Sequence, residues 1–162
     1  MLESIFSQIP IFAGLTPAQL EILEEIFELE LCLDDGFIFE QGDIAEYLYI
    51  VVEGEVIIYF KPDDGETITV AIIKHGGVFG WSSAFGSDTY TSGASCTANT
   101  NLLRVRGEDL KKLHIQHPKM GLLILERLAA VVAERMRNSS THTQVVALLE
   151  HALTNGVKPI GG

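Results

Sequence analysis

The spacing of apolar residues divides this chain into a helical start, a long series of strands and a helical end. Near the start, Thr16-Pro17-Ala18-Gln19 offers a hydroxyl that can cap a helix, a proline for the first helical position and a glutamine three residues after the cap. A helix of about a dozen residues is expected there, with Leu20, Leu23 and Phe27 on one face. A shorter helix is expected over Leu2 to Gln8.

From Glu28 onward the period changes to two. Leu29, Leu31 and Leu33 alternate with more polar residues, which is the repeat of a half-buried strand. Four further runs rich in β-branched and aromatic residues follow, separated by turns that contain Gly or Asp. They are FIFE at 37–40, EYLYIVV at 46–52, EVIIYF at 55–60 and TITVAII at 67–73. With two more strands within Tyr90–Ala98 and Leu102–Arg106, this regular spacing predicts a sandwich, barrel or roll.

Helical periodicity returns after Gly107. We expect a short helix around Glu108 to His114, a break at Pro118 and a long helix from about Lys119 to Arg137. A last helix is expected at about Thr143 to Leu153, before a loose tail.

The long helix carries an apolar stripe that is wider than one packing surface requires. One seam is spaced 3, 4, 3, 4 and consists of Leu122, Leu125, Ala129, Val132 and Met136. A second seam beside it consists of Ile124, Leu128 and Val131. One seam can cover the strands while the other meets a second subunit, which predicts a homodimer through this helix. Alternatively the whole stripe packs inside one monomer, because two heptads fall short of a coiled-coil signal.

Length and composition fit one domain with a hydrophobic core, since 47% of the 162 residues are hydrophobic. No apolar stretch approaches the ~20 residues that span a bilayer, and the N-terminus lacks the features of a signal peptide. A cytoplasmic protein without membrane contact is therefore expected. Cys32 and Cys96 lie far apart among apolar or small residues, so we expect buried thiols rather than a disulfide or metal site.

The net charge of −11 is unevenly distributed along the chain. Residues 1–103 carry 17 acidic residues against Lys61 and Lys74, a balance of −15, whereas residues 104–162 carry nine Lys and Arg against five acids, a balance of +4. A nucleic acid duplex requires a basic footprint. Direct DNA binding is therefore not expected.

The order of helices, glycine-punctuated strands and a long closing helix resembles the cyclic nucleotide-binding domain family, which includes the sensor half of catabolite activator protein and kinase regulatory subunits. The resemblance covers about residues 5–137 and rests on IFAGL at 11–15, FEQGD at 39–43, LYIVVEGEV at 48–56 and GGVFG at 76–80. It implies a mainly β fold, a jelly-roll-like β-roll (a double-stranded β-helix) with N-terminal helices and a long C-terminal helix. Residues 1–137 would form this domain, and 138–162 an extra helix and tail.

In that family, a phosphate-binding cassette runs from a Phe-Gly-Glu triplet through a short helix to an Arg-x-Ala triplet. Its glutamate binds the ribose hydroxyl and its arginine pairs with the cyclic phosphate. The resemblance implies as ligand-binding residues Phe79, Gly80, Trp81, Ser82, Ser83 and Ala84, then Thr91, Ser92, Gly93 and Ala94. Trp81 takes the glutamate position and Ser92 the arginine position, with Thr91 as the alternative if the loop gap is placed differently.

Both replacements weaken the case for a cyclic nucleotide. A hydroxyl in place of arginine removes a bidentate, charge-assisted pair with the cyclic phosphate. The free energy of binding is expected to weaken by about 2–5 kcal/mol. Trp81 cannot accept the ribose hydrogen bond, and its bulk fills part of the site. A cyclic nucleotide is therefore disfavoured and no other cofactor is expected. The hydroxyls and free amides suit a neutral polar molecule or a weakly held anion; alternatively, Trp81 plugs a vestigial pocket.

Other chemistry finds less support in the sequence. A cupin-like metal site needs several histidines in the strands, and His75 is the only one before residue 114. No nucleophile elbow, phosphate-binding loop or dinucleotide fingerprint is present, so an enzyme is not expected. Family regulators place a helix-turn-helix domain after the long helix, whereas 25 residues follow Arg137 here.

Three hypotheses remain open. The first is a regulatory or sensor module that binds a small molecule other than cAMP, or has lost ligand binding, and signals through its C-terminal helices. The second is a pure protein-interaction or dimerisation module. The third is the sensor half of a Crp/Fnr-type transcription regulator that still binds a cyclic nucleotide.

Overall fold

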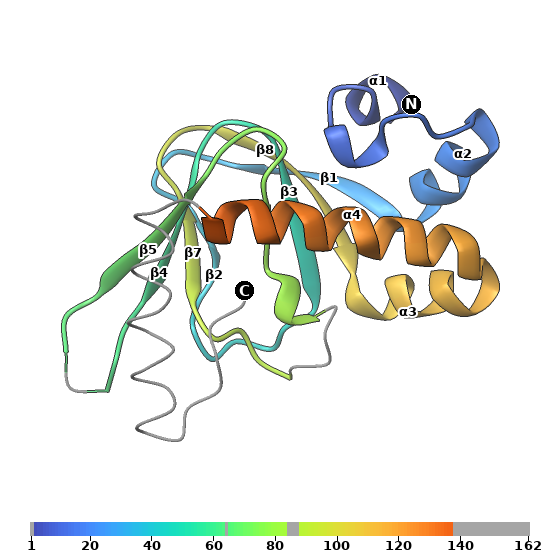
Figure 1. Cartoon of the computed structure of the whole chain (residues 1–162). Helices are drawn as coiled ribbons and strands as arrows, with labels where there is room; N and C mark the ends of the chain where they lie inside the picture. Colours follow the sequence, from blue (N-terminus) through green and yellow to red (C-terminus); the bar gives the residue numbers. More distant parts are fainter. Residues whose placement is uncertain (1, 64, 84–87, 138–162) are drawn as a thin grey trace.

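Two four-stranded antiparallel sheets and a group of helices make up the computed structural model, which describes residues 2–63, 65–83 and 88–137 (Figure 1). Sheet A has the order β1-β8-β3-β6, and sheet B has the order β2-β7-β4-β5. The strands are β1 (Phe27–Cys32), β2 (Phe37–Phe39), β3 (Tyr47–Glu53), β4 (Val56–Phe60), β5 (Ile68–Ile73), β6 (Val78–Phe79), β7 (Gly93–Cys96) and β8 (Thr100–Arg106). The predicted β-roll with flanking helices is confirmed.

The described residues contain six helices, of which the four α-helices begin within one residue of the predicted starts and η1 was not predicted. They are α1 (Glu3–Phe6), η1 (Pro10–Phe12), α2 (Pro17–Ile26), η2 (Trp81–Ser83), α3 (Gly107–Gln116) and α4 (Pro118–Arg137). At the start of α2 the Thr16 hydroxyl accepts a hydrogen bond from the Gln19 backbone N–H, and the Gln19 side chain accepts one from the Thr16 N–H. The helix has 10 residues because Phe27 is already extended and pairs with Val105 in β1.

Strand β1 is confirmed, but its polarity is the reverse of an ordinary half-buried strand. Leu31 is 60% exposed and Leu29 is also exposed, whereas Glu30 is half-buried and Cys32 is buried. The reason lies in other strands, since Arg104 of β8 faces Glu28 and Glu30. The acidic positions of the repeat therefore face a cation, and the apolar ones face outward.

The expectation of two buried thiols is wrong in one respect. Cys32 and Cys96 are buried, but they form a disulfide across 64 residues of chain, with Cα atoms 6.5 Å apart. The fold brings them together because the turn after β1 lies against the end of β7, where the Cys96 N–H bonds to the Gly36 carbonyl at 3.0 Å. This proximity depends on sheet pairing and is not encoded in the sequence spacing.

Buried side chains form two clusters, one on each side of sheet A. The cluster inside the roll lies between the two sheets and includes Phe39, Tyr49, Phe79 and Tyr90. The cluster outside sheet A joins the helices to its strands, with Phe6, Phe12 and Leu23 packed on the outer residues of β1, β3 and β8. The helices therefore pack on sheet A.

Helix α4 packs against this helical layer and is hydrogen-bonded to it. Ile124 and Leu128 are buried in the cluster outside sheet A, and the Arg127 guanidinium donates hydrogen bonds to the carbonyls of Ile11 and Ala13 at 2.7 and 2.6 Å. No helix in the described part of the chain is long and apolar enough to cross a membrane. The predicted last helix, Thr143–Leu153, lies outside the described residues.

Candidate ligand-binding site

The first part of the predicted cassette lies where β6 leaves sheet A. Phe79 is fully buried, and Gly80 has a φ of +72°, which favours glycine. A Cβ at Gly80 would lie 3.0 Å from the Tyr47 carbonyl oxygen and 3.1 Å from the Tyr49 ring. Glycine therefore allows the backbone to turn directly against β3 and enter η2.

The short helix expected after Gly80 is present as η2, a single 3-10 turn. Ser82 is buried within it, whereas Trp81 is half-buried and packs on the cluster outside sheet A, the cluster that Val131 of α4 also contacts. Trp81 is thus part of the packing between the cassette and the helical layer. The backbone of Ser83 belongs to η2, but its side chain and Ala84 lie outside what the structure describes.

The second part of the cassette leads into β7. Thr91 is half-buried, and Ser92, Gly93 and Ala94 are buried. A Cβ at Gly93 would collide with the Tyr59 ring. The Ser92 hydroxyl is fully enclosed and has no hydrogen-bond partner among the described residues, an arrangement that costs free energy unless another group bonds to it.

Tyr90 and Phe39 connect the two parts. The Tyr90 ring stacks on Phe39 with 3.6 Å between centroids, and Phe39 lies 3.4 Å from the Cβ position of Gly80. The Tyr90 hydroxyl also accepts a hydrogen bond from the Tyr47 N–H and donates one to the Tyr47 carbonyl. Burial raises the pKa of Tyr90 above its ordinary value, although its hydrogen bond with the Tyr47 backbone acts in the opposite direction. The fold thus assembles the predicted cassette around an aromatic wall.

A cation that the sequence analysis did not associate with the cassette lies beside this wall. The Arg104 guanidinium is 4.1 Å from the centroid of the Tyr47 ring. Its Nε donates to Glu28 at 2.7 Å, and its Nη2 lies 3.2 Å from Glu30. Burial lowers the pKa of Arg104, but the hydrogen bond to Glu28 and the charge of Glu30 outweigh this and raise it. Two carboxylates therefore already neutralise this charge.

The comparisons with known proteins identify the family. A profile described as the cyclic nucleotide-binding domain matches residues 34–117, which is about half of the chain. The chain belongs to the cyclic nucleotide-binding domain family.

Its similar proteins include receptors and regulators. The cyclic AMP receptor protein of Thermus thermophilus is 28% identical over 141 residues, which are 87% of this chain and 63% of that protein. The chain therefore spans less than two thirds of this relative. A putative cyclic nucleotide-binding protein from Geobacter metallireducens has a TM-score of 0.69 at 26% identity, covering 80% of this chain and 93% of its own. A regulatory subunit of a cAMP-independent protein kinase A from Trypanosoma brucei shares the fold alone, with a TM-score of 0.68 at 16% identity over 91% of this chain and half of that one.

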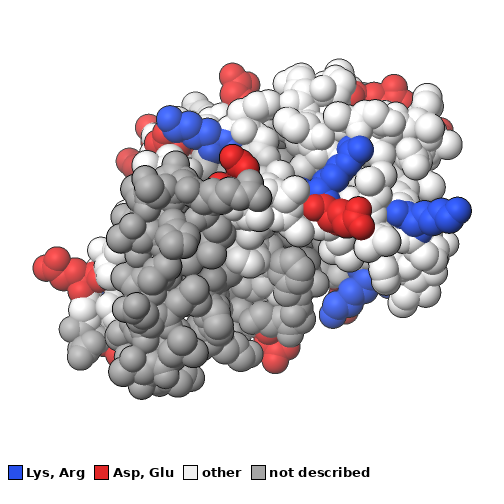
Figure 2. Space-filling model, viewed as in Figure 1, with Lys and Arg blue, Asp and Glu red and all other residues white. Residues whose placement is uncertain are grey.

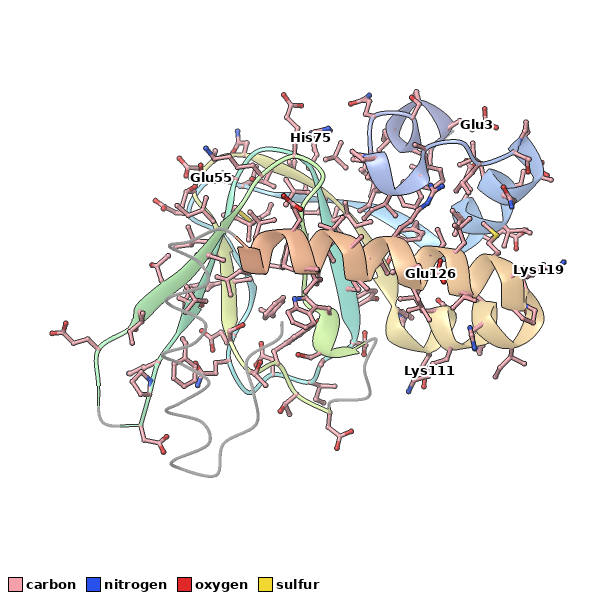
Figure 3. All side chains as sticks on the ribbon, viewed as in Figure 1. Glu3, Glu55, His75, Lys111, Lys119 and Glu126 are labelled. Carbon is pink, nitrogen blue, oxygen red and sulfur yellow. A yellow bond between two sulfur atoms is a disulfide. The ribbon has the colours of Figure 1, made fainter. Side chains whose placement is uncertain are left out.

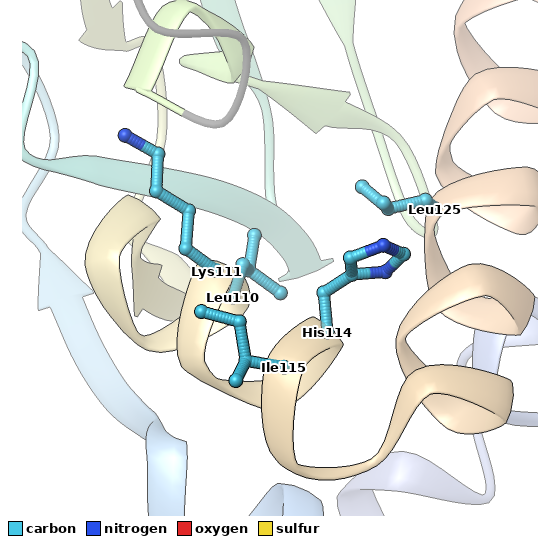
Figure 4. A pocket seen from close by; sticks show the side chains of 5 residues that line it. All are labelled: Leu110, Lys111, His114, Ile115 and Leu125. Carbon is cyan, nitrogen blue, oxygen red and sulfur yellow. The ribbon is translucent and has the colours of Figure 1, made fainter.

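This family member has a hollow on its helical side. It measures about 330 Å³ and is lined by Leu110, Lys111, His114, Ile115 and Leu125 (Figure 4). Helices α3 and α4 pass closely beside it, since a Cβ at Gly121 would lie 2.6 Å from the His114 Cα. Within the described residues, no group of three His, Cys, Asp or Glu side chains could hold a metal ion.

The two seams predicted for the long helix occupy different surroundings. Ile124 and Leu128 are buried, and Val131 packs on the same cluster. On the other seam Leu122 is 51% exposed, Ala129 is exposed, and Leu125 and Val132 are half-buried. The side chain of Met136 is outside the description. The alternative in which the whole stripe packs inside one monomer is therefore wrong for Leu122 and Ala129.

Proposed function

We propose that this chain is a non-enzymatic regulatory module whose cassette does not hold a cyclic nucleotide in the family's usual way. The observation that supports this proposal is the environment of Ser92. This residue takes the arginine position of the family motif, is fully buried and supplies no positive charge. Arg104, which lies over the Tyr47 ring, is already paired with Glu28 and Glu30. A cyclic phosphate entering here would lose its water without gaining a counter-charge.

The same residues support a small polar ligand without a full negative charge. The enclosed Ser92 hydroxyl can donate or accept one hydrogen bond. Tyr90, two residues before Ser92, stacks on Phe39, and the two rings form an apolar wall. The acidic balance of residues 1–103 also repels anions. A neutral polar molecule satisfies the hydroxyl without this repulsion.

A titration of the full chain with cAMP, followed by calorimetry and by the fluorescence of Trp81, tests the proposal. Two variants restore the charged anchors: Trp81→Glu with Ser92→Arg, and Trp81→Glu with Thr91→Arg for the alternative gap placement. We expect at least one to bind cAMP about 30-fold to several-thousand-fold more tightly than the unmodified chain. The design has a parallel in the Trypanosoma brucei subunit, of which a triple mutant that includes a Thr-to-Arg change was solved bound to cAMP.

The matched control is Ser95→Arg with Trp81→Glu, which adds the same charges but places the arginine on a half-buried residue of β7 outside the cassette. This control should not gain affinity. Saturable micromolar binding of cAMP by the unmodified chain would contradict the proposal and favour the sensor half of a transcription regulator that uses a cyclic nucleotide.

A second candidate function is a pure interaction module. It is favoured by Trp81, which packs on the cluster of the helices and so can close the cassette. A thermal-shift screen against a metabolite library separates the two candidates, because a ligand that binds the native state raises the melting temperature. A stabilising compound whose effect Ser92→Ala abolishes supports the sensor; no stabilising compound supports the interaction module.

The seam of Leu122, Leu125, Ala129, Val132 and Met136 is the surface that we propose for homodimerisation. Leu122 of this seam is 51% exposed, and Leu125 of the same seam lines the hollow between α3 and α4 beside His114 (Figure 4). Lys and Arg side chains are scattered rather than gathered on the face shown in Figure 2. Lys111 and Lys119 lie on the helices at one end of the molecule, whereas Glu55 and His75 lie toward the other end (Figure 3). This distribution of charge fits a module that acts through protein contacts, without direct DNA binding.

A further inference from the structure

Sheet B has an outer face with a continuous row of residues across all four strands. Phe37 of β2 pairs with Ser95 of β7, Ser95 pairs with Ile57 of β4, and Ile57 pairs with Ile72 of β5. Paired residues of adjacent antiparallel strands point to the same side, so these four side chains share one face. Phe37 is 69% exposed and Ile72 is 56% exposed.

This row, which we call the sheet B row, has no cover in the described part of the chain. The helical residues that join a buried cluster do so in the cluster outside sheet A, and the cluster inside the roll contains strand and loop residues. Tyr59, two residues after Ile57, lies on the same outer face across Gly93 and extends the apolar surface. Large exposed apolar side chains in one row typically mark a surface that another segment covers.

The dimensions of the row suit one helix. Adjacent strands lie about 4.8 Å apart, so four strands span about 14 Å, and a helix with its side chains is about 10–12 Å wide. An occupant therefore needs one apolar helix face of a few turns.

The sequence after α4 provides such a segment. If residues 143–153 are helical, as their sequence predicts, Val145, Val146, Leu149, Ala152 and Leu153 share one face, while Glu150 and His151 lie off it. In Figure 1, α4 ends on the side of the view where β4 and β5 lie. The linking residues 138–142 can span roughly 20 Å when extended.

Charge favours this segment over a second copy of the roll. Residues 138–162 contain one Lys and one Glu and so have no net charge apart from histidine, whereas residues 1–103 have a balance of −15. Pairing two sheet B faces would bring two acidic rolls together, which repel each other. We propose that the sheet B row is the docking surface for residues 143–153 of the same chain. Because β7 follows Ser92 directly, this docking would place the segment on the strand that continues from the cassette.

Photo-cross-linking of the full chain tests this inference. The probe is p-benzoylphenylalanine in place of Ile72, a position where the exposed side chain tolerates replacement. We expect cross-links to residues 143–153, at the mass of a single chain. The same probe in place of Ile115, which is exposed on α3, should give none to that segment.

A matched pair of variants tests the contact itself. Leu149→Asp and His151→Asp each place an acidic side chain in the segment, the first on its apolar face and the second off it. We expect Leu149→Asp to lower the cross-link yield from position 72 about tenfold or more and His151→Asp to leave it unchanged. No cross-link from position 72, cross-links between two chains, equal yields from positions 72 and 115, or equal effects of the two variants would each overturn the proposal. None of these outcomes depends on whether the cassette binds a ligand.

Discussion

The hydroxyl of Tyr90 makes hydrogen bonds with both backbone groups of Tyr47, accepting from the N–H at 3.0 Å and donating to the carbonyl at 2.6 Å. Tyr90 immediately precedes the second part of the cassette, and Tyr47 begins β3. In addition, the Tyr90 N–H donates to the Asp43 carbonyl and its carbonyl accepts from the Gly42 N–H. This residue therefore fixes the position from which Thr91 and Ser92 enter β7.

Tyr90→Phe should lower the free energy of unfolding by about 1–3 kcal/mol, because it leaves the N–H and carbonyl of Tyr47 without these partners in a partly buried site. Urea unfolding followed by far-ultraviolet circular dichroism measures the change. Tyr59→Phe is the control, since Tyr59 lies half-buried on the outer face of sheet B, and we expect a change within about 0.5 kcal/mol. Equal effects of the two variants would show that the Tyr90 hydroxyl has no special role.

Stability should fall at alkaline pH. Burial is the main cause that raises the pKa of Tyr90 and of Tyr49 above the ordinary value of 10.0. The unfolded chain therefore ionises at lower pH than the folded one, so the stability from these groups is fully present below about pH 10 and is lost as the pH rises further. Melting temperatures from pH 8 to 12, together with absorbance of tyrosinate, measure this. A melting temperature that stays constant while both tyrosines ionise would contradict the assignment.

The disulfide should contribute strongly to stability. Replacing Cys32 and Cys96 together by serine opens a loop of 64 residues, for which the chain-entropy relation gives a loss of about 4 kcal/mol. Dithiothreitol should destabilise the unmodified protein and have no effect on the double variant. If thiol titration of the freshly unfolded, unreduced protein gives two free cysteines, the disulfide assignment is wrong.

Leu122→Asp should dissociate the proposed homodimer, because it places a charge at the exposed start of the seam on α4. Sedimentation velocity over a range of protein concentrations measures the mass. Leu31→Asp is the control, since Leu31 is exposed on β1, far from α4 in sequence. A monomer at all concentrations before any substitution, or a dimer that survives Leu122→Asp, argues against this interface.

Much of the fold could be predicted because local signals decide it. The capping residues Thr16 and Gln19 begin α2 as expected, and Pro118 begins α4. The two-residue strand β6 was missed as a strand because two residues carry no periodic signal; it exists through its pairing with Tyr49 and Ile50 of β3. The buried side of β1 could not be predicted correctly from its alternation either, because it depends on Arg104 of β8, which faces Glu28 and Glu30.

The candidate site likewise combines features that were predicted from the sequence with features that only the structure shows. The segments from Phe79 to Ser82 and from Thr91 to Ala94 were assigned to the cassette from the family resemblance alone, and the replacement of both charged anchors remains a prediction from that assignment. The sequence could not show that Arg104, well beyond the cassette in the chain, lies beside Tyr47 and is neutralised by Glu28 and Glu30. Nor could it show that the hydroxyl of Ser92 is enclosed.

The sequence by itself determined the family fold and the order of most helices and strands, because these depend on local periodicity and on motif residues at fixed spacing. Only the tertiary structure decided which side of β1 is buried, that Cys32 meets Cys96, which seam of α4 covers the roll, and that the outer face of sheet B has no cover in the described part of the chain. Each of these depends on contacts between residues far apart in sequence, and the pairing of strands fixes them.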